Sequence, residues 1–351
     1  MARTISDTFM IRIHPLLLIL ALILALPAMA QEHFCVMELN AENLFTPTDN
    51  PLTDDDDFTP QSARRWTWSK FTGKIRNLGK EIAAAGGMVP PDIVALCEVE
   101  DDSAMVRLTK TGPLRRAHYN YFITKGLDKR GINCALLYNE DTYKPFFRRD
   151  IRPDFTGLPA KTTRDILYVA GRIATGDTLD IMVCHLPSRL DPRKQGRPYR
   201  ERIAAMLRAF ADSLSATRMH YNLIITGDFN DPPESAALDR VLRAAPPDTV
   251  APQSAGLYNL MRHKDVMRGV NGTYCYKGKW EIIDNFIVSG RLLSPDAPLN
   301  IRPASCFIFA PSFLLHKAEG AIVPYRSYSG IDYIGGFSDH LPVVARFDYS
   351  W

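Results

Sequence analysis

A short apolar run that ends in a polar turn constrains this chain more than any other stretch. Residues 223–225 are typical of a buried strand, and Gly227 ends the run. Asp228 can bind a metal or accept a proton. Asn230 points the same way if the backbone stays extended, because strand side chains alternate between faces. Asp and Asn also favour tight turns without any chemistry, so this stretch alone predicts either a catalytic strand end or a structural turn.

The first 30 residues have the layout of a secretory signal peptide. Arg3 and Arg12 precede an apolar run over residues 16–26, and small residues before Gln31 offer a cleavage site. The run is short for a membrane span, and an uncleaved anchor is the alternative. No later run is apolar enough to cross a bilayer. We therefore expect an exported protein, periplasmic or extracellular, that is soluble and monomeric.

The mature chain carries little net charge. Removal of residues 1–30 deletes Arg3, Arg12 and Asp7, so the formal charge falls from +3 to +2. This is not the excess expected of a protein that binds nucleic acid by charge alone, so any such contact must be local. The six cysteines show no CxxC or zinc spacing. They could pair in an exported protein, but several lie in apolar strand-like runs, which indicates small buried side chains.

Short strands and helices follow one another along the chain without a Gly/Ser linker. Strands are expected over residues 34–39, 92–98, 119–124, 132–138, 165–173, 179–184, 223–225, 273–276, 282–288, 301–309 and 341–347. Helices are expected over residues 62–85, with Ser62 as the cap, and over 197–213 and 235–243. The pattern predicts one layered α/β domain over residues 31–351. Residues 306–336, long, aromatic-rich and irregular, are expected to form a lid or a substrate-facing loop.

Polar side chains stand at the ends of several of these strands. The set comprises Asn40, Glu98, His185, Asp228, Asn230, Asp284, Asp339 and His340. Oxygen-dominated ligands suit a hard cation such as Mg²⁺, Mn²⁺ or Ca²⁺, whereas Zn²⁺ would favour more His or Cys. A hard cation beside general-acid and general-base groups is suited to phosphoester hydrolysis. Cys97 precedes Glu98, so it is expected to face the packed layer if Glu98 faces the site.

Eight short motifs occur in order along the chain, at residues 38–40, 96–98, 130–137, 163–165, 184–188, 227–230, 283–284 and 338–340. With these motifs the chain resembles the endonuclease/exonuclease/phosphatase superfamily, over nearly all of residues 34–348. That group includes pancreatic-type deoxyribonucleases, abasic-site endonucleases, sphingomyelinases and inositol-polyphosphate phosphatases. The resemblance implies a four-layer sandwich in which two mixed sheets pack face to face with helices outside. It places the site at one end of the sandwich.

The resemblance also implies a ligand set for the metal. Glu98 would be the central ligand of Mg²⁺, or of Mn²⁺ or Ca²⁺, with Asn40 and Asp339 beside it. Arg164 would contact a phosphate oxygen. These roles are carried over by position in the motifs.

The remaining residues would carry the acid–base chemistry. Asp228 and Asn230 would hold the phosphate, the water or a second metal. His340 would pair with Asp284 and act as a general base or as a cation that stabilises the phosphate. His185 would face the leaving-group oxygen as general acid, or donate to the phosphate. In pancreatic-type deoxyribonucleases the corresponding histidine rests on a separate Glu, and no partner for His185 can be placed in the sequence.

Taken together, these features predict a secreted, metal-dependent phosphodiesterase, with a nuclease acting on nucleic acid as the favoured form. The alternative is a phosphatase or phospholipase C-type enzyme acting on inositol phosphates or sphingomyelin, that is, on a phosphorylated small molecule or a lipid head group. A membrane-active enzyme needs exposed apolar loops, which residues 305–328 could provide. A non-catalytic binding protein on the same scaffold is a third possibility, against which the intact set of site residues argues.

Overall fold

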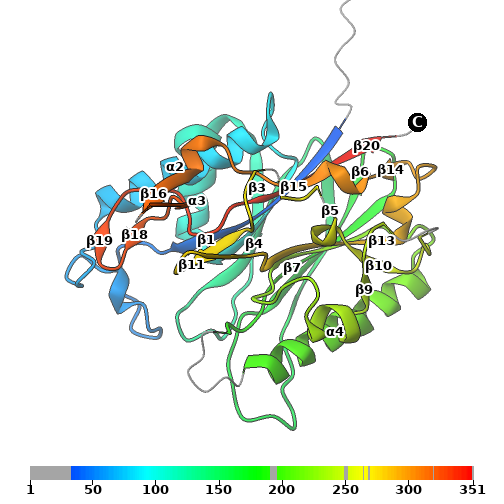
Figure 1. Ribbon diagram of the computed structural model, residues 1–351, viewed down its shortest axis with the longest axis horizontal. Helices are drawn as coiled ribbons and strands as arrows, with labels where there is room; N and C mark the ends of the chain where they lie inside the picture. Colours follow the sequence, from blue (N-terminus) through cyan, green and yellow to red (C-terminus); the bar gives the residue numbers. More distant parts are fainter. Residues whose placement is uncertain are drawn as a thin grey trace, which may run out of the picture. The chain divides into compact units, whose positions relative to one another are not determined.

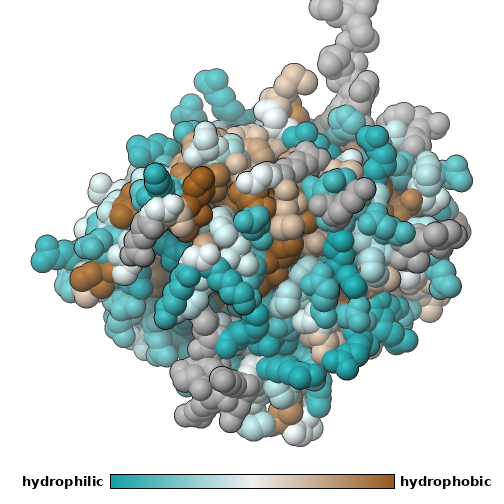
Figure 2. Space-filling view, in the orientation of Figure 1, coloured by the Kyte–Doolittle hydropathy of each residue, from teal (hydrophilic) through white to brown (hydrophobic). Residues whose placement is uncertain are grey.

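The computed structural model describes residues 33–189, 196–248, 252–263, 265–267, 269–318 and 320–349. The predicted signal peptide, residues 1–30, lies outside these residues. No helix within the described ranges has both the length and the apolar character needed to cross a bilayer. Hydrophilic side chains predominate on the face shown in Figure 2.

Two seven-stranded mixed sheets form the centre of the fold (Figure 1). The first contains β1 (His33–Leu44), β2 (Ile93–Val99), β3 (Tyr119–Ile123), β4 (Asn133–Asn139), β14 (Leu299–Asn300), β15 (Cys306–Ile308) and β20 (Val343–Tyr349). Its order is β14-β20-β1-β2-β4-β3, and β15 also pairs with β20. In this sheet β1 lies between β2, which is parallel to it, and β20, which is antiparallel.

The second sheet contains β5 (Tyr143–Ile151), β6 (Ile166–Ile173), β7 (Thr178–His185), β8 (Leu223–Asp228), β9 (Ala244–Ala245), β10 (Leu257–Asn259) and β13 (Asp284–Ser289). Its order is β5-β6-β7-β8-β13-β10-β9. The strands β7 and β8 are parallel, and β13 runs antiparallel to β8. These three strands form the centre of the sheet and carry much of the predicted site.

The two sheets pack face to face, and helices cover their outer faces. Alternate residues of both sheets share one core, in which Val36 of β1 joins Ile181 of β7 and Phe286 of β13. A second core lies between the first sheet and the helices α2 (Trp68–Gly86) and α3 (Asp102–Lys110), and a third lies between the second sheet and α4 (Gly196–Thr217). The helices α2 and α4 lie on opposite sides of the sheets (Figure 1). The predicted four-layer α/β sandwich is confirmed.

Several boundaries differ from the sequence expectation. Helix α2 begins at Trp68, because Thr67 and not Ser62 caps it by accepting from the backbone N–H of Lys70. The expected helix near residues 235–243 is a single π-helical stretch, Ala236–Val241. The expected strand over residues 301–309 is interrupted by a 3₁₀ turn, Pro303–Ser305, because Pro303 cannot donate to a ladder. Strand β5 and helix α3 were not expected.

Residues 306–336 are more regular than their sequence suggests. They contain β15, the hairpin of β16 (Leu315–Ala318) with β17 (Ala321–Pro324), and the hairpin of β18 (Tyr328–Ser329) with β19 (Asp332–Tyr333). The side chain of Asn77, on α2, donates to the carbonyl oxygens of Gly335 and Gly336 at 2.9 and 2.8 Å. The segment therefore packs on α2, as a strap that leads into Asp339 and His340.

All six cysteines are buried, and no disulfide joins any of them within the described part of the chain. Cys97 belongs to the core between the sheets, and Cys184 to the core under α4. Their predicted burial is confirmed, and disulfides contribute nothing to the stability of the described fold.

Candidate functional site

Three adjacent strands of the second sheet place His185, Asp228 and Asp284 in one row. His185 is paired in register with Asp228, and Asp228 with Asp284. Each continues the alternation of its own strand toward the first sheet, because Val183, Ile224 and Phe286 belong to the core between the sheets. Strand periodicity alone therefore turns these three side chains toward the first sheet, where the strands end.

The first sheet contributes Asn40 and Glu98 by two different routes. Asn40 continues the inward-facing alternation of Val36 on β1. The same alternation would turn Glu98 away from the sheet interface, but the ladder of β2 is irregular between Leu96 and Val99. Glu98 adopts a left-handed backbone with φ +62° there. Bulges of this kind re-aim a side chain, and this one directs Glu98 into the site.

A cavity of about 750 Å³ opens at this end of the two sheets. Every predicted site residue except Asp284 lines it, namely Asn40, Glu98, Arg164, His185, Asp228, Asn230, Asp339 and His340. Asp284 is fully buried behind His340. None of the described residues in 306–336 lines this cavity, so the expectation of a substrate-facing lid was wrong. The cause is the packing of that segment on α2.

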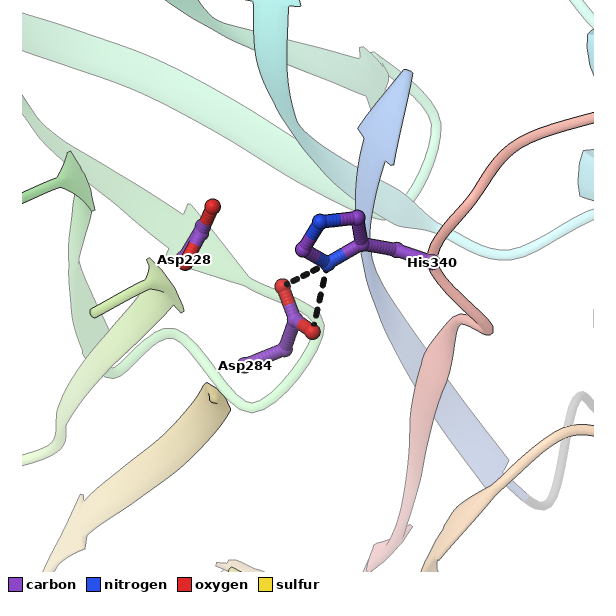
Figure 3. A group of neighbouring side chains, drawn as sticks. All are labelled: Asp228, Asp284 and His340. Atoms are coloured by element: carbon purple, nitrogen blue, oxygen red, sulfur yellow. Dashed lines mark hydrogen bonds and ion pairs between the residues drawn. The ribbon is translucent and has the colours of Figure 1, made fainter. Parts of the chain in front are cut away.

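His340 and Asp284 form a buried ion pair. The Nδ1 atom of His340 lies 2.8 and 3.0 Å from the two carboxylate oxygens of Asp284 (Figure 3). Burial lowers the pKa of His340, but Asp284 outweighs it and holds that pKa well above the ordinary value. This ion pair favours the imidazolium form of His340, and Nε2 remains to face the cavity. The ring of Tyr274 packs against it, 4.8 Å from centroid to centroid.

The charge state of His185 is the opposite. Burial, followed by the charges of Arg164 and Arg130, holds the pKa of His185 well below its ordinary value. Its Nε2 lies 3.3 Å from Oδ2 of Asp228, and its Nδ1 has no hydrogen-bond partner among the described residues. Burial and the nearby Asp284 raise the pKa of Asp228 to about 7. A neutral imidazole thus lies beside a carboxyl group that is poised to exchange a proton near neutral pH.

The turn after β8 is a structural Asx turn, and its residues also line the cavity. The backbone N–H of Asn230 donates to Oδ1 of Asp228 at 2.8 Å, which is an Asx turn, and Asn230 has φ +50°. The backbone is therefore not extended at Asn230, and the condition on which the expected alternation of Asp228 and Asn230 rested is not met. Asn230 still lines the cavity, because its side-chain amide donates to the carbonyl oxygen of Leu186 at 3.0 Å. Gly227, at φ +139°, is required because a Cβ there would collide with the carbonyl of Cys184.

Arg164 is buried and already makes two polar contacts. Its Nη1 donates to Asp128 and its Nη2 to the carbonyl oxygen of Leu186, both at 2.8 Å. Its Nε has no hydrogen-bond partner in the described ranges. Arg164 lines the cavity and fixes the loop after His185, and a direct contact with phosphate remains a prediction.

The predicted metal ligands supply oxygen donors to one cavity. Oε2 of Glu98 accepts from the backbone of Asn43 at 3.0 Å, and the Asn40 amide bridges to Oδ2 of Asp228 at 3.1 Å. Burial, followed by the Glu42 and Glu98 carboxylates, raises the pKa of Asp339 to about 6. A divalent cation would offset this repulsion between carboxylates, and oxygen-only donors suit a hard one. The side chains present therefore fit the expected metal.

A second group of ligand-type atoms overlaps this site. One ligand atom each from Asp228, Asp284 and His340 lies within 4.8 Å of the others (Figure 3). The Nδ1 atom of His340 forms an ion pair with Asp284, which lies beside Asp228. This ion pair, and not a metal, accounts for the close spacing of the three residues. We retain Glu98, Asn40 and Asp339 as the predicted metal ligands.

The structure adds residues that the sequence did not single out. Asp128, Lys161, Glu281 and Tyr276 line the cavity. They come from loops and from the hairpin of β11 (Tyr274–Tyr276) with β12 (Lys279–Glu281). The sequence predicted a strand over residues 273–276, but nothing in it placed these four side chains at the site. Arg189, at the start of a basic run in the sequence, forms an ion pair with Glu281 at the cavity. The distance from Nη2 of Arg189 to Oε2 of Glu281 is 2.6 Å.

Comparison with known proteins agrees with this architecture. The family model of the endonuclease/exonuclease/phosphatase family matches residues 35–348. An endonuclease/exonuclease/phosphatase family protein from Bacteroides thetaiotaomicron is similar, with TM-score 0.59, 16% identity and coverage of 91% of this chain and 95% of that one. A mannosyl-6-phosphatase from the same organism gives TM-score 0.59, 16% identity, and coverage of 91% and 100%. D. rerio TDP2, complexed with a single-strand DNA product, gives TM-score 0.55 and 14% identity, with coverage of 90% of this chain and 99% of that one. A search of curated proteins finds no match.

The two-sheet sandwich and its acid–histidine cavity define a hydrolytic phosphoesterase, a class whose members depend on divalent metals. This chain belongs to the endonuclease/exonuclease/phosphatase family.

Proposed function

We propose that this chain is an exported, divalent-metal-dependent phosphodiesterase that hydrolyses nucleic acid. One observation carries the proposal. His185, Asp228 and His340, the last held from behind by Asp284, line the same cavity as the predicted metal ligands Glu98 and Asp339. An in-line attack at phosphorus needs groups on both sides of the reacting atom, and this cavity supplies them. The layout of residues 1–30 supports export.

The charge states of the site residues suggest which catalytic role each of them has. A metal held by Glu98, Asn40 and Asp339 would polarise the phosphoryl group and stabilise developing negative charge. Asp228, with a pKa of about 7, would take the proton of the attacking water. The side-chain amide of Asn40 orients that carboxylate by donating to Oδ2.

The two histidines donate rather than accept. Asp284 raises the pKa of His340, which favours its charged form, so we favour the alternative in which His340 stabilises the phosphate. His185 is neutral and is a poor acid, so it donates a hydrogen bond to the phosphate. An activated nitrophenyl diester tests this assignment, because its departing oxygen needs no proton. His185→Ala should lose activity equally on nitrophenyl diester and on DNA, and rescue by the activated substrate would assign His185 as the general acid instead.

The lipid-hydrolase alternative loses its main support. Phe307, Ile308 and Leu314 are buried, and Phe309, Phe313 and Leu315 are half-buried against the cores. These side chains therefore do not form the exposed apolar loop that a membrane-active phospholipase needs. The phosphatase alternative stays open, because the similar structures include both a mannosyl-6-phosphatase and a TDP2 with single-strand DNA product.

A substrate panel tests the proposal. Purified protein is assayed with Mg²⁺, Mn²⁺ and Ca²⁺ on DNA, RNA, bis(p-nitrophenyl) phosphate, p-nitrophenyl phosphate, sugar phosphates, inositol phosphates and sphingomyelin vesicles. We expect metal-dependent hydrolysis of diesters, with kcat/KM highest on nucleic acid. Faster hydrolysis of a phosphomonoester than of every diester would overturn the proposal in favour of a phosphatase.

A further inference from the structure

A second cavity continues from the site on the side of the loops before β4 and β6. It measures about 820 Å³ and is lined by Asp128, Lys129, Arg130, Pro153, Phe155, Pro159, Ala160, Lys161, Thr162 and Tyr199. Four of these residues, Asp128, Arg130, Lys161 and Thr162, also line the catalytic cavity. The two cavities therefore share one wall, and a ligand held at the metal ligands can extend across it. We call this second cavity the outer cavity.

The outer cavity has a positive rim. Lys129, Arg130 and Lys161 line it, and Asp128 is the one acid in its wall among the described residues. That acid is already paired, because Arg164 donates to its carboxylate at 2.8 Å. Lys129 is exposed to solvent. The rim therefore favours a ligand that carries a further negative charge beyond the reacting phosphate.

The floor of the outer cavity is apolar and is held in place. It is formed by Pro153, Pro159 and the rings of Phe155 and Tyr199. The two rings meet edge to face, with centroids 4.9 Å apart at 86°. The hydroxyl of Tyr199 donates to the carbonyl oxygen of Pro159 at 2.9 Å, and the ammonium of Lys161 lies 5.0 Å from the Tyr199 ring centroid. Tyr199 is buried, whereas Phe155 is half-buried and keeps a face toward the cavity.

From this combination we propose that the outer cavity binds the nucleotide next to the scissile phosphate of a single-stranded nucleic acid. The base would stack on Phe155 and the prolines, and its phosphate would lie against Lys129 and Arg130. Aromatic stacking beside cations is the usual recognition of single strands, because the bases of a duplex are already stacked on one another. This inference rests on the proposed nuclease function, and it adds the strandedness of the substrate and the site that selects it.

Binding without cleavage tests the proposal. The full chain is titrated into a fluorescein-labelled 12-nucleotide single strand in excess chelator, and anisotropy reports the Kd. Loss of a base–aromatic stack in Phe155→Ala should weaken binding about ten-fold. Lys129→Ala should weaken it less and reduce the slope of log K against log salt by about 0.7, the value for one phosphate contact with a single strand. Lys144→Ala, an exposed lysine that lines neither cavity, is the matched control.

Two further measurements separate the possible failures. A small diester, bis(p-nitrophenyl) phosphate, should be hydrolysed at the wild-type rate by both variants, because it fills only the catalytic cavity. Duplex DNA of the same sequence should bind Phe155→Ala and the wild type alike. Thermal melts check folding, and Lys129→Ala decides the matter if Phe155→Ala does not fold.

If neither variant weakens single-strand binding, the outer cavity is not a subsite. The same conclusion follows if Phe155→Ala weakens the binding of duplex and single strand equally. If the wild type hydrolyses no diester but the binding differences persist, the proposed function fails while the subsite stands.

Discussion

At the scale of single residues, Glu98 carries the most specific prediction. Its carboxylate faces the cavity because of the left-handed bulge in β2, and Asp339 lies close enough for their charges to interact. Glu98→Gln keeps the size and removes one negative charge from the predicted metal shell. We expect kcat/KM to fall by at least ~10²-fold, which reflects lost metal binding, with little change in thermal stability. Metal titrations of both proteins check this, and full wild-type activity in excess chelator would contradict the metal assignment.

His340 and Asp284 should act as one unit. The two carboxylate oxygens of Asp284 lie 2.8 and 3.0 Å from Nδ1 of His340, so they stabilise the charge of the imidazole and fix its orientation. His340→Ala and Asp284→Ala should each lower kcat by ~10²–10³-fold, the usual cost of losing one charge-stabilising donor. The double variant should lose little more than the worse single one, because groups that act together are non-additive. Rates of the four proteins on one diester form a double-mutant cycle, and additive losses would show that Asp284 has a separate role.

The next scale is the structural element, where α2 holds the strap that leads to the site. Asn77→Ala removes the two hydrogen bonds to the carbonyls of Gly335 and Gly336, just before Asp339. We expect a stability loss of about 1–2 kcal/mol. The metal concentration for half-maximal activity should also rise, because Asp339 loses its support. Thr72→Ala, at another exposed position on α2, is the control. An unchanged metal requirement would show that the strap does not position Asp339.

The elements also show what a sequence can and cannot reveal. His185, Asp228 and Asp284 could be predicted, because apolar strands lead straight into them and the structure keeps the period of two. The route of Glu98 into the cavity could not, since a bulge reverses the face that alternation assigns. Strand β5 escaped notice because it is an edge strand with Pro145 and several exposed charged residues, so it lacks an apolar face.

The outer cavity was equally hidden from the sequence. Lys129 and Phe155 come from different loops, and Tyr199 comes from the first turns of α4. Loop residues carry no periodicity, so only the tertiary structure brings them together. By contrast, the prediction of a lid at residues 306–336 was wrong, because a high aromatic content indicates a packed segment as readily as a functional one.

At the scale of the whole molecule, the stability of the fold should depend on Glu81 and pH. This residue of α2 is fully buried, and its carboxyl group has no hydrogen-bond partner among the described residues. Burial raises the pKa of Glu81 to about 8, so the folded state binds a proton that the unfolded chain, with a pKa near 4.5, releases. The contribution of Glu81 to stability is therefore present at low pH. It falls by about 1.4 kcal/mol per pH unit between these values as pH rises.

Glu81→Gln mimics the protonated form and removes this dependence. Urea unfolding at pH 5, 6.5 and 8 should show the smallest difference between variant and wild type at pH 5. At pH 8 the variant should be the more stable protein. A difference that stays constant with pH would show that Glu81 is ionised in the folded protein.

The pairing of β1 with β20 has a consequence for how the chain reaches its fold. His33 lies opposite Asp348 across 315 positions of sequence, and the strand that carries Asn40 has β20 as one of its two neighbours. A chain still emerging from the ribosome lacks β20, so β1 keeps an open edge until Val343–Tyr349 have been synthesised. Contacts this distant make folding slow, because a very long loop must close first. We therefore expect the first sheet to be completed late in folding, once β20 has docked on β1.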